Sequence, residues 1–124
     1  MASKPPSCNV YGTIVDQWEL LDYLTEAGSD PYADWLAGLA DRVARARILA
    51  RTQRLRAGVF GDCKALREGV WELRVDHGPG YRVYYAQAGR RLVLLLIGGD
   101  KRAQRSDIQT AVCYWQDWLR RNPK

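Results

Sequence analysis

The sequence predicts an α+β fold in which two N-terminal helices pack on a four- to five-stranded antiparallel sheet, and a C-terminal helix follows. Three observations predict this fold. Apolar residues recur with a helical period across residues 30–56, and they alternate or run together as in strands across residues 62–97. The gaps between the strand-like segments are short and rich in turn residues, which favours antiparallel neighbours. A further helical period follows residues 98–99, and 124 residues are enough for one hydrophobic core.

The N-terminal segment divides into a leader and the start of the domain. Met1–Val10 is polar, contains prolines and lacks periodicity, so we expect residues 1–15 to be a flexible leader and residues 16–124 a single domain. The apolar segment Trp18–Leu24 indicates a first strand, with a short helix as the alternative. No apolar run is long enough for a membrane span or a signal peptide. We therefore expect a cytoplasmic protein with no membrane partner.

Two helices are predicted before the strands. Asp30 and Pro31 match an N-cap followed by proline at the first helical position. The helix that follows carries an apolar stripe formed by Tyr32, Trp35, Leu36 and Leu39. A second helix is predicted over about Asp41–Arg56, and Gly58 ends it. Its apolar stripe is formed by Ala44, Ile48 and Leu55.

Four strands and a closing helix are predicted in the second half of the chain. Gly78, Pro79 and Gly80 fit a type II turn, and the last strand is apolar on both faces, which places it centrally in the sheet. Ser106–Gln109 matches a capping box that begins a helix with an apolar side. The predicted strands are Asp62–Leu66, Val70–Val75, Tyr81–Gln87 and Leu92–Ile97. The apolar side of the closing helix is formed by Ile108, Ala111, Val112, Trp115 and Leu119.

The charge of the chain suggests a polyanionic partner. Lys and Arg number 19 against 14 Asp and Glu, and the formal net charge is +5. Arginines crowd residues 42–56, where Arg47, Arg51 and Arg54 share one helical ridge. This ridge could hold RNA phosphates or an acidic partner, and a merely solvated ridge is the alternative.

The cysteine and histidine content excludes several classes of site. The three cysteines are widely spaced and odd in number, and no Cys-x-x-Cys pair is present. With a single histidine, the chain lacks the ligands for a zinc site and the residues for a ribonuclease that uses two histidines. We therefore expect neither a metal nor another cofactor.

The hairpin registers gather charged side chains on one face of the sheet. If the apolar faces coincide, Val75 pairs with Tyr81, which sets Arg74 opposite Arg82 and places Glu72 opposite Tyr84. The preceding three-residue turn sets Lys64 opposite Glu72 in the same way. Two arginines directly opposite each other repel, and an anion between them would remove that cost. The predicted patch consists of Lys64, Glu72, Arg74, Arg82 and Tyr84.

This patch has the chemistry for metal-independent RNA cleavage. Such cleavage uses the 2′-hydroxyl of the RNA as nucleophile, and it needs a base, cations around the phosphate and an acid for the leaving oxygen. Glu72 is the candidate base, and Lys64, Arg74 and Arg82 are the candidate clamp. Tyr84 is the candidate acid, or a platform on which a base stacks. The alternative is an ordinary polar sheet face with surface ion pairs.

A second candidate site follows the last strand. Two glycines, Gly98 and Gly99, would let a phosphate or another backbone approach closely, and Lys101 and Gln104 could then contact a ligand. The alternative is a strand-to-helix connection that needs glycine for packing.

Three motifs together resemble a known family. They are Gly69-Val70-Trp71-Glu72-Leu73-Arg74, then Gly78-Pro79-Gly80-Tyr81-Arg82-Val83-Tyr84-Tyr85, and then Gly98-Gly99-Asp100-Lys101 with Gln104. In this order and spacing, within residues 32–115, they resemble the HigB-like addiction-module killer proteins of the RelE/ParE superfamily. The polar positions that recur in that family fall here on Lys64, Glu72, Arg74, Arg82, Lys101 and Gln104.

The resemblance implies a compact RelE-like toxin of a type II toxin–antitoxin system. Its implied partners are a cognate antitoxin, often of the helix-turn-helix type, and the ribosome with its mRNA, which the toxin would cleave to inhibit translation. Two alternatives stay open, a ParE-like inhibitor of DNA gyrase without catalysis and an inactive binding module. The tyrosine or histidine that some relatives place near the last helix has no clear counterpart here, where Gln109 stands.

Overall fold

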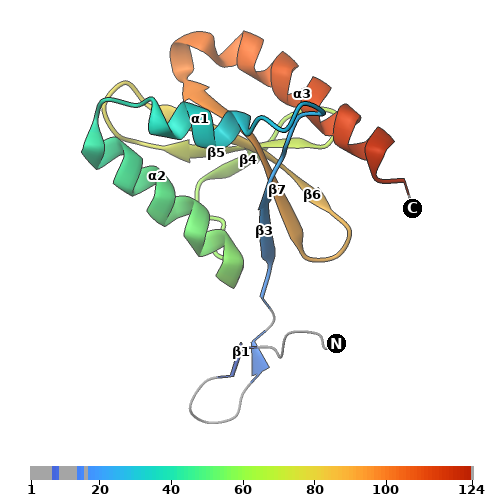
Figure 1. Cartoon of the computed structure of the whole chain (residues 1–124). Helices are drawn as coiled ribbons and strands as arrows, with labels where there is room; N and C mark the ends of the chain where they lie inside the picture. Colours follow the sequence, from blue (N-terminus) through green and yellow to red (C-terminus); the bar gives the residue numbers. More distant parts are fainter. Residues whose placement is uncertain (1–6, 9–13, 16, 124) are drawn as a thin grey trace.

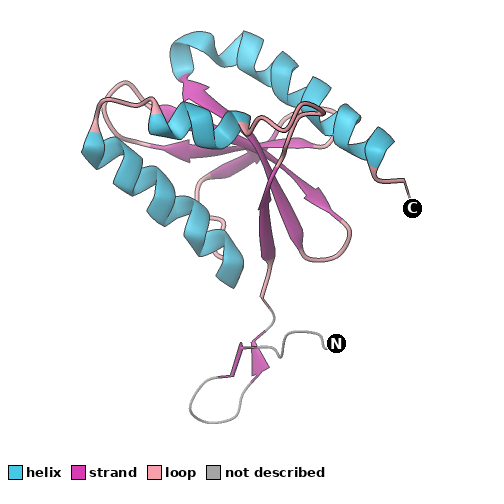
Figure 2. Ribbon diagram, viewed as in Figure 1, coloured by secondary structure: helices cyan, strands magenta, loops and turns pink. Residues whose placement is uncertain are grey.

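The computed structural model describes residues 7–8, 14–15 and 17–123, and it has a sheet between two layers of helix (Figure 1). Helices α1 and α2 cover one face of the sheet, and α3 crosses the other face (Figure 2). The sheet consists of β3 (Glu19–Asp22), β4 (Cys63–Ala65), β5 (Val70–Val75), β6 (Tyr81–Ala88) and β7 (Leu92–Asp100). The helices are α1 (Pro31–Ala37), α2 (Arg42–Arg54) and α3 (Gln104–Arg121), with short 3₁₀ turns at Leu55–Ala57 and Lys101–Ala103.

The sheet confirms the predicted α+β class but is mixed rather than wholly antiparallel. Its strand order is β3-β7-β6-β5-β4, so β7 is an interior strand, as its apolar sequence predicts. The four strands from β4 to β7 are antiparallel neighbours, whereas β3 pairs with β7 in parallel. Tight turns fix the directions of the four strands from β4 to β7 relative to one another. β3 reaches β7 through two helices and three strands, so no hairpin turn constrains its direction.

The hairpin registers agree with the prediction. Val75 pairs with Tyr81, Glu72 with Tyr84, and Arg74 with Arg82. Lys64 pairs with Glu72 across β4 and β5. Alternating apolar residues therefore determine which side chains share a face, and the polar residues follow.

The helix ends show where local sequence signals succeed and where one fails. Asp30 caps α1 by accepting a hydrogen bond from the Ala33 backbone at 2.9 Å, and Gly58 ends the turn after α2 with φ of 79°. The predicted capping box at Ser106 is wrong, because α3 already begins at Gln104. The Asp100 side chain accepts from the Arg102 backbone at 2.9 Å instead and begins the 3₁₀ turn that leads into α3.

Two apolar clusters hold the layers together. One lies between the sheet and the helices α1 and α2, where Ile48, Leu73 and Val83 are fully buried. The other lies beneath α3, where Tyr84, Leu96 and Ala111 are fully buried. The sheet face that carries the predicted polar patch therefore also forms one side of a second apolar core.

The predicted leader lies largely outside the described residues. Of residues 1–15, the structure describes β1 (Ser7–Cys8) and β2 (Ile14–Val15), which form an antiparallel pair. The flexibility of the leader stays a prediction. Among the described helices, none combines the length and apolar character that crossing a membrane requires.

Candidate functional site

The predicted polar patch lies under the N-terminal end of α3. Pairing of β4, β5 and β6 places Lys64, Glu72, Arg74, Arg82 and Tyr84 on one face, as predicted. The first residue of α3, Gln104, reaches the same place and donates a hydrogen bond to Glu72. We call these six residues the Glu72 cluster.

Glu72 is the centre of this cluster and is buried, with a relative exposure of 1%. Its Oε2 accepts a hydrogen bond from Arg74 Nε at 2.9 Å, and its Oε1 accepts one from Gln104 Nε2 at 2.8 Å. Arg82 Nε lies 3.4 Å from Oε1, close enough for an ion pair but not directed as a hydrogen bond. A buried carboxylate needs such partners, because its desolvation is costly.

The Glu72 carboxylate relieves the electrostatic repulsion between the two opposed arginines. The sequence suggested that a bound anion would relieve their repulsion, and the structure places this carboxylate there instead. The hydrogen bond to Glu72 raises the pKa of Arg74 further above its ordinary value. The Arg74 side chain keeps 35% of its surface exposed and that of Arg82 keeps 17%. Part of each arginine side chain therefore lies at the surface, where it can contact a ligand, while Glu72 holds it from below.

Tyr84 is fully buried, which rules out one of its two predicted roles in this conformation. No base can stack on a ring with 0% exposure. Its hydroxyl has no hydrogen-bond partner among the described residues, and burial, followed by the nearby charges of Glu72 and Asp107, raises its pKa. Its role as proton donor stays a prediction.

The Gly-Gly pair at the end of β7 serves packing. A Cβ on Gly98 would collide with the Trp35 ring of α1, and a Cβ on Gly99 would collide with the Asp107 carboxylate of α3. The two glycines thus let helices on both faces approach the same strand. Lys101 follows them, is exposed, and has its aliphatic chain beside Gly80 in the β5–β6 turn.

The arginine ridge on α2 separates into two kinds of residue. Arg51 is half-buried and donates hydrogen bonds to the carbonyls of Arg74 at 2.6 Å and Phe60 at 3.2 Å, so it ties α2 to the sheet. Arg47 and Arg54 are exposed and line a surface pocket of about 260 Å³ with Asp76. Arg51 also lines this pocket, but its guanidinium already donates to two carbonyls, so Arg47 and Arg54 are the better candidates for the predicted RNA contact.

Asp107 is a polar residue of this region that the sequence did not single out for function. It lies in the first turn of α3, and its Oδ2 is buried without a hydrogen-bond partner among the described residues. Burial, followed by the charge of Asp100, raises its pKa. The sequence pattern at Ser106–Gln109 suggested only a capping box, so no local signal pointed to a carboxylate above Gly99.

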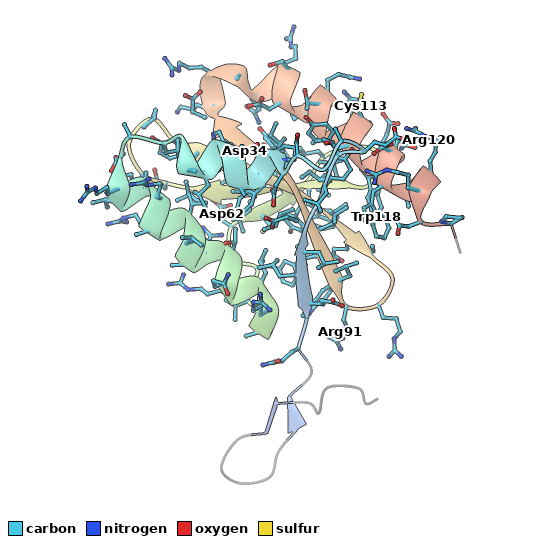
Figure 3. All side chains as sticks on the ribbon, viewed as in Figure 1. Asp34, Asp62, Arg91, Cys113, Trp118 and Arg120 are labelled. Atoms are coloured by element: carbon cyan, nitrogen blue, oxygen red, sulfur yellow. The ribbon has the colours of Figure 1, made fainter. Side chains whose placement is uncertain are left out.

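The donor chemistry of the Glu72 cluster is cationic. In the described part of the chain, no group of three or more His, Cys, Asp or Glu side chains could hold a metal ion. An exposed carboxylate beside the cluster is Asp62, whose Oδ1 lies 3.7 Å from Arg74 Nη1 and which is labelled below α1 in Figure 3. The cluster can therefore bind an anion through guanidinium and ammonium groups.

Comparisons with known proteins cover this whole region. Residues 34–112, which include every residue of the Glu72 cluster, match the family described as phage-derived protein Gp49-like (DUF891). An uncharacterized protein of Haemophilus influenzae (strain ATCC 51907 / DSM 11121 / KW20 / Rd) is 48% identical over 80 residues, which cover 64% of this chain and 81% of that relative. The chain thus belongs to the Gp49-like family of phage-derived proteins, within the RelE/HigB-type toxin superfamily.

Proposed function

We propose that this protein is the toxin of a type II toxin–antitoxin system and acts as a metal-independent, ribosome-dependent mRNA endoribonuclease. The observation that carries the proposal is the pair of guanidinium groups, Arg74 and Arg82, held at the surface by the buried Glu72 carboxylate. Membership of a toxin family supports the coarser part and an antitoxin partner, and the chemistry of the Glu72 cluster supports the finer part.

The reaction that suits these residues is transfer of a phosphodiester to the neighbouring 2′-oxygen. The 2′-hydroxyl gives its proton to solvent water as its oxygen attacks the phosphorus, the bond from phosphorus to the 5′-oxygen breaks, and this oxygen takes a proton from solvent water. The products are a 2′,3′-cyclic phosphate and a 5′-hydroxyl. Negative charge grows on the phosphoryl oxygens in the transition state. Arg74, Arg82 and the exposed Lys64 would stabilise this charge, and preorganised cations are the usual source of such stabilisation.

Glu72 has a different role in this scheme from the general base that the sequence predicts. Its side chain has 1% exposure, and both oxygens already face donors, so a 2′-hydroxyl has no route to it in this conformation. We propose that Glu72 positions Arg74 and Arg82. Charged hydrogen bonds that fix a guanidinium in advance reduce the reorganisation needed in the transition state.

Lys101, Gln104 and the α2 arginines have distinct parts in this proposal. Lys101 is exposed beside the β5–β6 turn and would contact RNA directly. Gln104 would act through its hydrogen bond to Glu72. Arg47 and Arg54 would contact more distant phosphates.

The test uses purified protein with translating ribosomes and a defined message, and it maps cleavage by primer extension. We expect the wild type to cut the message. Arg82→Ala should lose on the order of 100-fold or more in cleavage rate, as expected when one charge-stabilising donor is removed. The matched control is Arg120→Ala, which removes an exposed arginine near the C-terminal end of α3 (Figure 3).

Other outcomes would replace this proposal. An intact message with wild-type protein, together with a block in gyrase supercoiling that Arg82→Ala retains, would identify a ParE-like gyrase inhibitor. Harmless expression without any partner protein would identify an inactive binding module. Equal cleavage by Arg82→Ala and Arg120→Ala would remove the Glu72 cluster from the mechanism.

A further inference from the structure

A basic groove extends from the Glu72 cluster along the side of α3. It runs between β4 and the first turns of α3, and it joins two surface pockets of about 480 and 340 Å³ that share Arg67. Its polar lining is Lys64, Arg67, Arg102, Arg105, Ser106 and Gln109. We call this surface the β4–α3 groove.

We infer that the β4–α3 groove binds the phosphates of the message that flank the cleavage site, with Arg67 and Arg105 as contact residues. This inference rests on the proposed function, because it takes RNA as the ligand of the Glu72 cluster. It assigns a binding site to residues that neither the sequence motifs nor the family match single out.

The state of the four cations in the groove supports this assignment. The side chains of Lys64 and Arg105 are exposed and have no ion-pair or hydrogen-bond partner among the described residues. Arg67 is held across the groove by Gln109 Oε1 at 2.8 Å, and Glu68 pairs with it from the exposed side at 2.8 Å. Arg102 pairs with Asp100 and remains 84% exposed. The groove therefore offers cations whose direction is partly fixed and whose charge is only partly neutralised.

The charges on the two sides of the Glu72 cluster indicate the side on which the RNA leaves it. On the β4–α3 side, Lys64 is the partner of Glu72 in the sheet and also lines the groove, so this residue belongs to both. On the other side of Arg74, the exposed carboxylate of Asp62 lies 3.7 Å from Arg74 Nη1. A polyanion that leaves the cluster is attracted by the cations of the groove and repelled by Asp62.

The character of the groove favours RNA over a protein segment. Four cationic side chains line its two pockets, and Leu66 and Ile108 are the larger of the apolar residues there. A pocket with more large apolar residues lies between β3, α1 and α2, where Leu20, Leu36 and Leu49 line about 550 Å³. Phosphate contacts need arginines in reach of solvent, whereas a docked helix needs an apolar floor.

The test measures binding of a fluorescein-labelled single-stranded 12-mer RNA by anisotropy over a range of salt concentrations, without ribosomes. The double variant Arg67→Ala/Arg105→Ala should bind on the order of 10- to 100-fold more weakly than the wild type. Its plot of log binding constant against log salt should become shallower by about 0.7 for each lost phosphate contact. The control, Arg90→Ala/Arg120→Ala, removes two exposed arginines outside the groove and should bind as the wild type does.

Two further measurements keep the result interpretable. Arg67→Lys/Arg105→Lys retains the charges and should recover most of the binding if the alanine variant loses it through charge rather than through misfolding. Ribosome-dependent cleavage by the wild type is measured in parallel. If the wild type cleaves the message and the alanine variant binds RNA as tightly as the wild type does, this inference is wrong and the proposed function stands.

Two other outcomes also overturn the inference. Absence of any RNA binding by the wild type would show that the groove has no such role. Unchanged RNA binding with loss of neutralisation by the antitoxin would show that the β4–α3 groove is a protein-docking surface.

Discussion

Glu72 is a buried carboxylate with partners in three directions. Arg74 from its own strand and Gln104 from α3 donate hydrogen bonds, and Arg82 from the next strand forms an ion pair. The free energy of desolvating the carboxylate is offset only while these partners remain. The same side chain thus stabilises the fold and fixes the surface cations.

The first prediction concerns loss of that carboxylate. Glu72→Ala should lower the free energy of unfolding by about 3–5 kcal/mol, because it leaves two neighbouring guanidinium groups with no counter-charge between them. Urea unfolding followed by circular dichroism measures the loss. Glu68→Ala is the control, because Glu68 belongs to an exposed ion pair and its loss should change stability by less than about 1 kcal/mol. Equal losses in the two variants would contradict the central role of Glu72.

At the scale of elements, α2 is attached to the sheet by both apolar packing and one arginine. Ala44 and Ile48 of α2 and Leu55 of the 3₁₀ turn that follows it are fully buried in the core on this side of the sheet, as their helical spacing predicts. Arg51 adds hydrogen bonds to two backbone carbonyls, one in β5 and one in the loop before β4. An arginine ridge read from sequence alone therefore mixes a structural residue with accessible ones.

The second prediction separates these two kinds of arginine. Arg51→Ala should lower the free energy of unfolding by about 1.5–3 kcal/mol, because charge-assisted hydrogen bonds to two carbonyls are lost. Arg47→Ala should stay within about 0.5 kcal/mol of the wild type, because Arg47 is an exposed surface residue. Chemical denaturation of both variants measures these changes in the free energy of unfolding. A destabilised Arg47→Ala beside an unaffected Arg51→Ala would reverse this assignment.

At the scale of the whole molecule, local sequence signals determine the hairpins, but they determine the arrangement of the layers less completely. Turn glycines and apolar alternation are enough to predict the register that pairs Glu72 with Tyr84 and Arg74 with Arg82. The parallel pairing of β3 with β7 depends on contacts between distant parts of the chain, which no local pattern encodes.

The candidate site shows the same division between local and distant information. The positions of its residues on one sheet face follow from the sequence, but their burial does not. Val70 and Tyr84, on the face expected to be polar, indicate a second apolar layer only once α3 is known to cross that face. The hydrogen bond from Gln104 and the burial of Glu72 are consequences of that crossing.

The third prediction concerns the pH dependence of global stability. Burial, and then the nearby Asp30 carboxyl, raise the pKa of Asp22 to about 7. Between about pH 4 and 7 the folded protein keeps a proton that the unfolded chain releases, so stability should fall as pH rises through this range. Asp22→Asn removes this effect, and its melting temperature should exceed that of the wild type at pH 8 but not at pH 4.

Thermal unfolding at several pH values measures this difference. The control is Asp34→Asn, which removes an exposed carboxylate from α1 and should show no gain that grows with pH. A melting-temperature difference between Asp22→Asn and the wild type that is constant from pH 4 to pH 8 would contradict the prediction.

The parallel edge strand has a consequence for the biosynthesis of this protein. β3 leaves the ribosome first among the strands of the main sheet, yet the strand it pairs with, β7, is the last of these strands to emerge. Closing so long a loop is entropically costly, so β3 must wait unpaired while the β4–β7 meander assembles from neighbouring residues. Pulsed hydrogen exchange during refolding should accordingly protect the β3 amides after those of β5 and β6. A nascent chain that has not yet released β7 carries an incomplete sheet and has no α3, so neither the Glu72 cluster nor the β4–α3 groove can form before those segments emerge.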